Sequence, residues 1–236
     1  MPKQKINWEA LRNDLCMYCE KYHTLFYEKF PFGGPSLHFH ERALSATGNN
    51  KIEMIYAMLV SWGMHRMGGG AQMHAFSTFK NSITKQNGKI AEIADKISTN
   101  NFSYSEMKDL FESIEPMKSR KKLVGHSKVL AHFFPDVVSP IDGEYTLQFT
   151  FGIGRKNLPS NFGEFEFFEQ FHSRLVKPLI NDAGFKIKCE NWIHLSSRGN
   201  YPWDTSLPKI IDNLIIGKMY GEKAQRRKGE LIPYKP

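Results

Sequence analysis

A carboxylate in a turn flanked by proline and glycine is the residue of this chain best placed for catalysis. Asp142 stands in the run PIDGEY, residues 140–145. A fixed carboxylate beside a sugar carbon stabilises the positive charge that develops when an N-glycosidic bond breaks, or it activates the attacking water. Asp before a helix is also a common N-cap, because its side chain accepts from backbone N–H groups. We therefore expect Asp142 to be a catalytic carboxylate, a helix cap, or both.

A short run ahead of Asp142 has residue types that bind phosphate. Gly125, His126 and Ser127 are expected at the start of a helix, where free N–H groups and the helix dipole favour an anion and a glycine allows close approach. A glycine here would equally serve a turn or helix packing. Lys128 follows, and a lysine becomes an effective nucleophile only in a desolvating pocket. We expect Lys128 to be either a catalytic amine or an exposed helix lysine.

The positive charge of the chain is concentrated in two segments. The formal charge is +8 at pH 7. Residues 116–135 hold five cations and no acid, and residues 217–228 hold five cations and one acid, so the rest of the chain is close to neutral. Concentrated cations neutralise phosphates and steer association with nucleic acid, although a solvated basic face and a loose cationic tail would have the same composition. The residues expected to contact DNA are Lys118, Arg120, Lys121, Lys122, Gly125, His126 and Ser127.

Two pieces of this region resemble the helix-hairpin-helix DNA glycosylases. LVGHSK, residues 123–128, is similar to the end of the family's hairpin, which reads LPGVG before a helix, and PID, residues 140–142, is similar to the turn that carries its catalytic Asp. The resemblance spans about 25 of the 236 residues. It implies a helical fold, DNA as the substrate and Asp142 as the catalytic carboxylate.

The sequence departs from that family at positions that bear on function. The first glycine and the proline of the hairpin are replaced by the region of Lys121 and Lys122. Ser127 stands where members with lyase activity usually have a lysine, and Lys128 comes one residue later. These departures affect the hairpin geometry and any lyase step. SKVLAHFFPDVVSPIDGEYT and DTSLPKIIDNLIIG are also similar to an uncharacterised prokaryotic protein family, a resemblance that implies no activity.

An enzyme that cleaves a base from DNA needs a pocket for that base. The target nucleotide leaves the stack, and its base enters a site with aromatic or apolar walls. The side chains expected to supply such walls are Trp62, Tyr145, Trp192 and Trp203.

Helices are expected to position these residues. Apolar side chains recur at three- and four-residue steps through most of the chain, and prolines and glycine runs end the segments. Pro178 should kink or interrupt its helix, and Ser103 with Glu106 forms a capping-box pattern. Weak strand patterns occur at residues 149–153 and 185–189. Helices are expected at residues 8–30, 36–46, 52–67, 73–85, 89–97, 104–114, 122–134, 162–182 and 208–220.

These patterns predict a mainly α fold, a compact multi-helix single domain that is similar to the helix-hairpin-helix glycosylases and has few or no short strands. Residues 1–220 are expected to form this domain, and residues 221–236 a basic C-terminal tail. No apolar stretch approaches the roughly 20 residues that cross a bilayer, and the first residues lack the apolar segment of a signal peptide. We therefore expect a cytoplasmic protein without a membrane partner.

Metal and cofactor chemistry is not indicated by the cysteines. Cys16, Cys19 and Cys189 are too few for a disulfide framework and are expected to be free thiols. Cys16 and Cys19 could approach His23 on one helix, but a structural zinc site needs a fourth ligand. We expect no metal and no cofactor.

The leading functional hypothesis is a DNA-repair hydrolase, a DNA glycosylase that releases a modified or damaged base by hydrolysing its N-glycosidic bond. The expected partner is DNA or RNA. The alternative is a non-enzymatic nucleic-acid-binding module that uses the same basic segment. A nuclease or other hydrolase with a metal site of His and carboxylate ligands is a third class, which would need several more carboxylates near His38 and His40.

Overall fold

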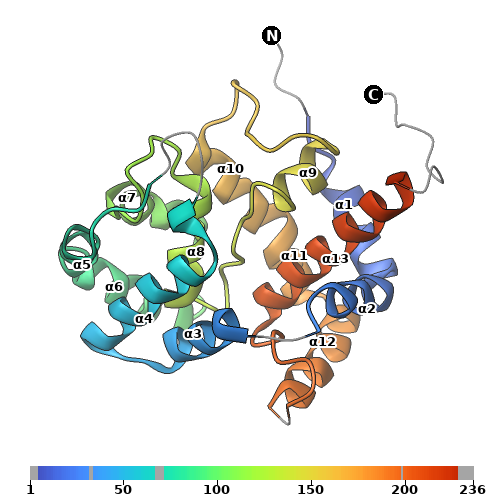
Figure 1. Cartoon of the computed structure of the whole chain (residues 1–236), viewed down its shortest axis with the longest axis horizontal. Coiled ribbons are helices and arrows are strands. Elements are labelled where there is room, and N and C mark those ends of the chain that lie inside the picture. The colour runs from blue at the N-terminus through green and yellow to red at the C-terminus, as the bar shows by residue number, and fades with distance from the viewer. Residues whose placement is uncertain (1–4, 32–33, 67–71, 198, 228–236) are drawn as a thin grey trace.

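The computed structural model describes residues 5–31, 34–66, 72–197 and 199–227, and helices dominate this part of the chain (Figure 1). The fold is mainly α, as predicted, and the one β pairing within these residues is an isolated bridge between Met73 and Met117. No helix in the described ranges is long and apolar enough to cross a membrane. The helices are α1 (Trp8–Met17), α2 (Cys19–Lys29), α3 (Gly34–Ser45), α4 (Gly48–Ser61), α5 (Phe76–Thr84), α6 (Asn87–Ser98), α7 (Lys108–Ser113), α8 (Leu123–Phe133), α9 (Thr146–Phe151), α10 (Glu164–Phe171), α11 (Lys177–Asn181), α12 (Ala183–Ser196) and α13 (Leu207–Arg227).

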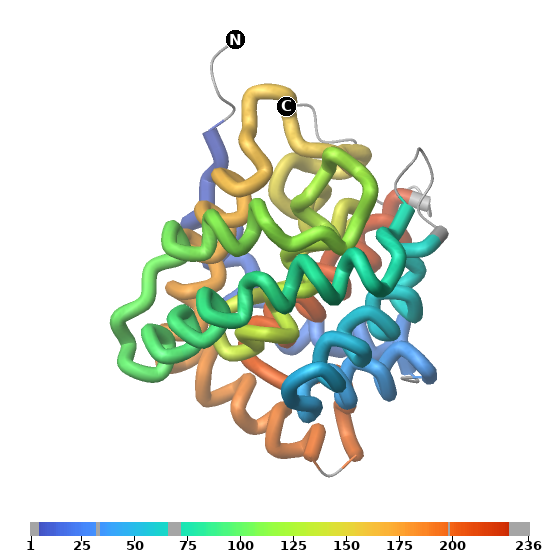
Figure 2. Tube along the Cα trace, turned by 90° about the vertical axis from the view of Figure 1, so that its left-hand side faces the viewer, coloured from blue at the N-terminus to red at the C-terminus, as the bar shows by residue number. Residues whose placement is uncertain are grey.

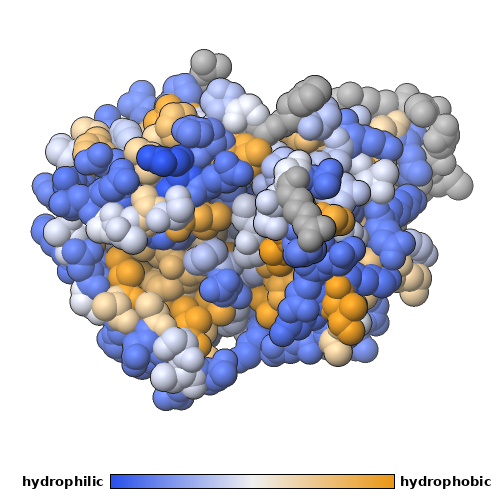
Figure 3. Space-filling view, turned by 90° about the horizontal axis from the view of Figure 1, so that it is seen from below, coloured by the Kyte–Doolittle hydropathy of each residue, from blue (hydrophilic) through white to orange (hydrophobic). Residues whose placement is uncertain are grey.

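Two groups of helices lie on either side of the segment that joins α8 to α9. In Figure 1, α3 to α8 form the left-hand group, and α1, α2, α12 and α13 form the right-hand group. The loop between α9 and α10 lies at the upper end of the molecule, close to the end of α13 in Figure 1 and again at the top in Figure 2. The opposite end, seen in Figure 3, has apolar side chains gathered over the half that α3 to α8 form.

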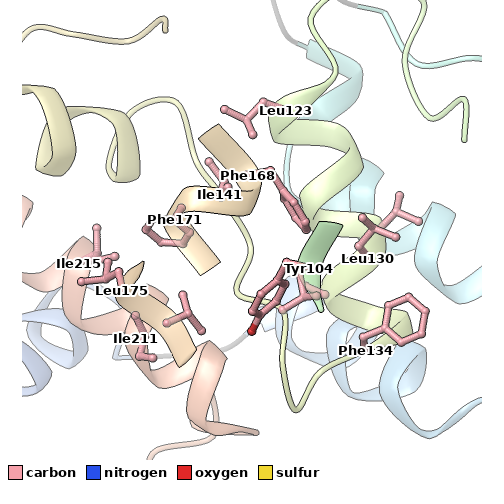
Figure 4. Close-up of a cluster of buried hydrophobic side chains, with 14 of the residues drawn as sticks. Tyr104, Leu123, Leu130, Phe134, Ile141, Phe168, Phe171, Leu175, Ile211 and Ile215 are labelled. Carbon is pink, nitrogen blue, oxygen red and sulfur yellow. The ribbon is translucent and has the colours of Figure 1, made fainter. Parts of the chain in front are cut away.

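A core of large apolar side chains joins the two groups. Figure 4 shows side chains from α8, α10 and α13 meeting around Ile141, which precedes Asp142 in the chain. Phe168 and Phe171 of α10 are fully buried in this core, and Trp8 of α1 packs edge-on against Phe171 with ring centroids 6.4 Å apart. The turn that carries Asp142 is thus attached to the hydrophobic core through Ile141.

The first predicted helix, residues 8–30, is divided into α1 and α2 at Tyr18. The backbone there leaves the helical region, with φ −112° and ψ 21°. The division lets each half pack on a different partner, since α1 places Trp8 against the aromatic rings of α10 whereas α2 lies along α13. A pattern read along the sequence cannot show this change of partner.

Helices α2 and α13 cross at two glycines. A Cβ atom at Gly217 would lie 2.0 Å from the carbonyl oxygen of Tyr22, and one at Gly221 would lie 2.8 Å from Leu25 Cδ1. The backbones therefore approach so closely that no side chain fits at Gly217. Helix α13 extends to Arg227, so residues 221–227 of the expected tail are helical, and residues 228–236 lie outside the described part of the chain.

The predicted helix at 162–182 is interrupted, but not at Pro178 itself. A π-helical turn at His172–Val176 separates α10 from α11. Pro178 is the second residue of α11, which directly follows this π-helical turn, and the missing N–H of proline there alters the hydrogen bonds of a continuing helix. The capping box of Ser103 and Glu106 is present as predicted.

The two weak strand patterns lie largely within helices. Residues 149–151 belong to α9, and residues 185–189 belong to α12. Phe185 and Cys189 are both buried and are four residues apart, the spacing that places side chains on one face of a helix. The short apolar run at 185–189 fits a helix as well as a strand, and packing decides for the helix.

Candidate functional site

The turn that leads into α9 holds Asp142 in a fixed orientation. The N–H of Ile141 donates to Ser127 Oγ at 3.0 Å, which ties the turn to α8. The N–H of Asp142 donates to Thr146 Oγ1 at 3.0 Å, and Asp142 Oδ1 accepts from the N–H of Glu144 at 2.7 Å. One carboxylate oxygen of Asp142 thus bonds within the turn, whereas the N-cap position of α9 is Tyr145 and no side chain caps it, so Asp142 is not the helix cap that the sequence also allowed. Its Oδ2 is left for a second partner.

Lys128 is that second partner. Its Nζ lies 3.2 Å from Asp142 Oδ2, so the two residues expected to be catalytic form an ion pair. The Lys128 side chain is 9% exposed and the Asp142 side chain 30% exposed. Lys128 Nζ also lies 5.3 Å from the centre of the Trp62 ring and 3.9 Å from Met64 Sδ. A molecule that approaches from solvent would meet the carboxylate before the amine.

The surroundings keep the Asp142 carboxylate ionised. Burial raises its pKa, but the charge of Lys128 and the N–H groups of Glu144 and Tyr145 lower it by more, and the net pKa lies below the usual value of an aspartate. At neutral pH the group is an acceptor of protons and a source of negative potential. Hydrolysis of an N-glycosidic bond needs a group in this state near the sugar.

The four aromatic residues expected to form a base pocket separate into two near the pair and two farther from it. Trp62 is partly buried beside Lys128, and Tyr145 lies partly exposed in the Asp142 turn. Trp203 is 7% exposed, and Trp192 stacks on His23 with ring centroids 3.9 Å apart. Trp62 thus lies at the pair and Tyr145 in its turn, whereas Trp203 is buried and Trp192 is partly buried against His23.

A buried polar network lies behind Trp62. Lys209 Nζ lies 5.9 Å from the centre of the Trp62 ring and donates to Asp212 Oδ2 at 2.7 Å and to Asn213 Oδ1 at 2.6 Å. Asn213 Nδ2 in turn donates to Asp204 Oδ1 at 2.8 Å. These residues were not predicted as site residues. The spacing of three and four between Lys209, Asp212 and Asn213 was visible in the sequence, but the burial of these residues was not.

Two histidines extend this network towards α8. His40 Nδ1 and His132 Nε2 lie 2.8 Å apart, and His132 Nδ1 donates to the carbonyl of Lys128 at 2.7 Å. His40 Nε2 lies 2.9 Å from Thr205 Oγ1. Burial lowers the pKa of both rings, that of His132 to about 4, so both are neutral at pH 7. The burial of His40 and its hydrogen bonds account for this residue without a role as metal ligand. In the described residues, no cluster of three or more His, Cys, Asp or Glu side chains is arranged to hold a metal ion.

The three residues expected at a phosphate are buried inside the protein. A Cβ at Gly125 would lie 2.8 Å from Met117 Cγ, so this glycine allows α8 to pack. His126 is 2% exposed and its Nδ1 lies 2.5 Å from the carbonyl oxygen of Phe111, while Ser127 is fully buried and bonded to the Asp142 turn. The expectation that they contact phosphate does not fit this geometry, and packing accounts for all three.

The start of α8 is also closed by another part of the chain. Glu164 Oε2, at the start of α10, accepts from the N–H groups of Lys122 and Leu123. A carboxylate therefore occupies the place at the helix N-terminus where a phosphate was expected. Lys122 Nζ donates to the carbonyl oxygen of Glu112 at 2.7 Å, so part of the hydrogen-bonding capacity of this amine is used within the protein.

Exposed cations lie on the segment before α8, and one further lysine of α13 lies at the Asp142 turn. Lys118, Arg120 and Lys121 are exposed on the segment that leads to α8. On the other side of the Asp142 turn, Lys223 Nζ lies 3.0 Å from Glu144 Oε1 and 4.9 Å from the centre of the Tyr145 ring. The two basic segments, which are about 100 residues apart in the sequence, thus meet the same turn through Lys128 and Lys223.

No family model, curated protein or solved structure matches this chain. The functional assignment consequently depends on the residues themselves. Their arrangement combines an ionised, partly exposed carboxylate, a nearly enclosed amine and two aromatic side chains, bordered by exposed cations.

Proposed function

We propose that this protein is a DNA glycosylase, a hydrolase that releases a modified or damaged base from a nucleic acid. The observation that carries the proposal is the contact between Lys128 and Asp142, which are 14 residues apart in the sequence and were selected independently of any contact. The pair lies where an ionised carboxylate reaches solvent beside Trp62. This combination suits attack on the sugar carbon of a nucleotide turned out of the stack.

Asp142 has the central chemical role in the proposed reaction. Its carboxylate accepts a proton from water as the water oxygen bonds to the sugar carbon and the bond from that carbon to the base breaks. The base leaves with the electron pair and takes up a proton from solvent, and Asp142 returns the proton that it accepted to solvent. Lys128 is the positioning residue that keeps the carboxylate ionised and directs Oδ2, while the N–H of Glu144 holds Oδ1.

A second mechanism for the same function has Lys128 as the nucleophile, and an experiment can distinguish it from attack by water. In that version the amine of Lys128 displaces the base, and Asp142 Oδ2, at 3.2 Å, takes the proton that the ammonium loses. The covalent imine to the sugar that follows is reduced by borohydride to a stable link. Hydrolysis by water leaves no such link.

The proposal is tested with a set of duplexes that each contain one modified, deaminated, oxidised or alkylated base. The expected result is an abasic site in at least one duplex, detected as strand cleavage after alkali. Borohydride trapping on the same duplex separates the Lys128 route from the water route. Duplexes that are bound but never converted to abasic sites would contradict the enzymatic proposal.

Binding without catalysis is favoured by one observation. Both Asp142 oxygens already have partners within the protein, one in the turn and one on Lys128. A binding module with the same exposed cations would bind duplexes and release no base. The duplex set therefore decides between the two functions.

A further inference from the structure

The loop between α9 and α10 carries a pair of exposed cations that the sequence analysis did not select. Arg155 and Lys156 are both exposed, and no carboxylate among the described residues forms an ion pair with either of them. The two lie outside the basic segments at 116–135 and 217–228 and are not prominent in the sequence.

Two contacts fix this loop beside the candidate site. Lys121 Nζ donates to Asn157 Oδ1 at 2.6 Å, which joins the loop to the basic segment before α8. A Cβ at Gly143 would lie 3.2 Å from the carbonyl oxygen of Lys156, so the loop backbone reaches the residue after Asp142. The loop is therefore attached both to the basic segment and to the Asp142 turn.

The loop has a defined backbone. Gly152 and Gly154 have φ values of +95° and +98°, a region that glycine adopts without strain. The N–H of Arg155 donates to the carbonyl of Gly152 at 3.2 Å, and the N–H of Gly154 donates to Gln148 Oε1 at 3.2 Å. These two hydrogen bonds fix a turn in the backbone, and Arg155 and Lys156 stand at the end of that turn.

The segment before α8 and the α9–α10 loop, which Lys121 and Asn157 join, together carry five exposed cations. Lys118, Arg120 and Lys121 come from the segment before α8, and Arg155 and Lys156 come from the α9–α10 loop. Within the described ranges none of the five is paired with a carboxylate; the one side-chain partner found is the neutral amide of Asn157 on Lys121. A surface with such unneutralised charge attracts an extended polyanion, and the phosphates of a nucleic-acid strand repeat closely enough to meet several cations at once.

We propose that Arg155 and Lys156 bind the sugar-phosphate backbone of a nucleic acid next to the nucleotide that faces Asp142, as part of one surface with Lys118, Arg120 and Lys121. The inference rests on the proposed function, because that function supplies the nucleic acid. It assigns the phosphate contacts to exposed cations on two connecting segments, in place of the buried residues at the start of α8 that the sequence predicted. Asn157 has a positioning role, since its side-chain oxygen holds Lys121 against the loop.

The test compares the salt dependence of binding between two double variants that lose the same charge. Arg155→Ala/Lys156→Ala removes the proposed contacts. Arg174→Ala/Lys177→Ala removes one exposed Arg and one exposed Lys from the region of α11, and is the matched control. Affinity for a fluorescent duplex oligonucleotide is measured across salt concentrations for both variants and the unaltered chain, and thermal melting confirms that each is folded.

Loss of two phosphate contacts makes the slope of log K against log salt less negative by about 1.8. We expect that change for Arg155→Ala/Lys156→Ala and a slope close to the unaltered one for the control. Equal slopes for the two variants, with salt-dependent binding by the unaltered chain, would overturn this inference and leave the proposed function standing. Salt-independent or absent binding by the unaltered chain would overturn both.

Discussion

Lys128 and Asp142 form an ion pair whose partners differ in exposure, and this difference predicts an asymmetric effect of mutation. Asp142→Asn leaves a nearly enclosed ammonium without a counter-charge, a change that we expect to lower the free energy of unfolding by about 3 kcal/mol. Lys128→Met leaves a carboxylate that water reaches, since 30% of the side chain is exposed, and we expect a loss of about 1 kcal/mol.

Denaturant unfolding of the single and double variants measures both losses and their coupling. In the double variant neither charge remains, so its stability should lie near that of Lys128→Met and above that of Asp142→Asn. Equal losses for the two single variants, with no coupling between them, would show that the pair contributes nothing to the folded state.

The lowered pKa of Asp142 predicts a pH dependence of stability. Because the folded-state pKa lies below the unfolded one, the ionised carboxylate stabilises the fold fully above the ordinary value of about 4, and this contribution is lost as the pH falls through the lowered pKa. Three buried histidines add a second effect, because burial lowers the pKa of His126, His132 and His172 to about 4. As the pH falls from about 6.5 to about 4, the unfolded chain takes up protons that the folded chain does not, and the free energy of unfolding falls.

Melting curves of the unaltered chain and of Asp142→Asn separate these effects, because the histidines are common to both. We expect the melting temperatures of the two proteins to differ by a constant amount above about pH 5 and to converge at lower pH. Parallel curves down to pH 2 would contradict a lowered pKa at this residue.

At the residue level, type and spacing pointed to Asp142 and Lys128, which form an ion pair in the structure, but did not exclude Gly125, His126 and Ser127. A glycine and two polar residues at the start of a helix look the same in sequence whether they face solvent or core. The difference is made by Met117, Phe111 and Ile141, which contact these three residues in the folded protein.

The contact between α2 and α13 gives the sharpest prediction at the level of the helices. Gly217→Ala would place a Cβ atom 2.0 Å from a backbone oxygen that cannot rotate away, so we expect the free energy of unfolding to fall by about 3 kcal/mol or more. Gly88→Ala is the matched control, because Gly88 lies in α6 with open space around it and should be neutral or stabilising by about 0.5 kcal/mol. Chemical denaturation measures both, and a similar small effect of the two changes would refute the close crossing.

Helices whose signals are local were predicted well, and those set by distant partners were not. Ser103 and Glu106 cap their helical turn through contacts three residues apart, which the sequence displays. The division at Tyr18 depends on α10 and α13, and the helical state of residues 185–189 depends on packing. Both lie beyond the reach of a periodicity argument.

For the whole molecule, the fold brings together charges that the sequence keeps apart. The α9–α10 loop and the end of α13 both lie at the turn of Asp142, the loop at Gly143 and α13 through Lys223, and Lys121 joins the segment before α8 to that loop. The charge distribution along the sequence indicated the segment before α8 and the end of α13. It did not indicate the loop, because Arg155 and Lys156 are only two cations in a neutral stretch. Convergence of this kind is a property of the tertiary structure alone.

The most direct test of the proposed function is single-turnover base release by Asp142→Asn, on the duplex that the unaltered chain converts. Asp136→Asn, at an exposed aspartate on the connection from α8 to α9, is the matched control for loss of one negative charge. Measurements are made well below the melting temperature of each variant, with duplex binding recorded alongside. We predict that Asp142→Asn binds the duplex and loses base release by at least a hundredfold, about 2.7 kcal/mol of transition-state stabilisation, while Asp136→Asn keeps full activity. Full base release by folded Asp142→Asn would contradict the assignment of this carboxylate as the catalytic group.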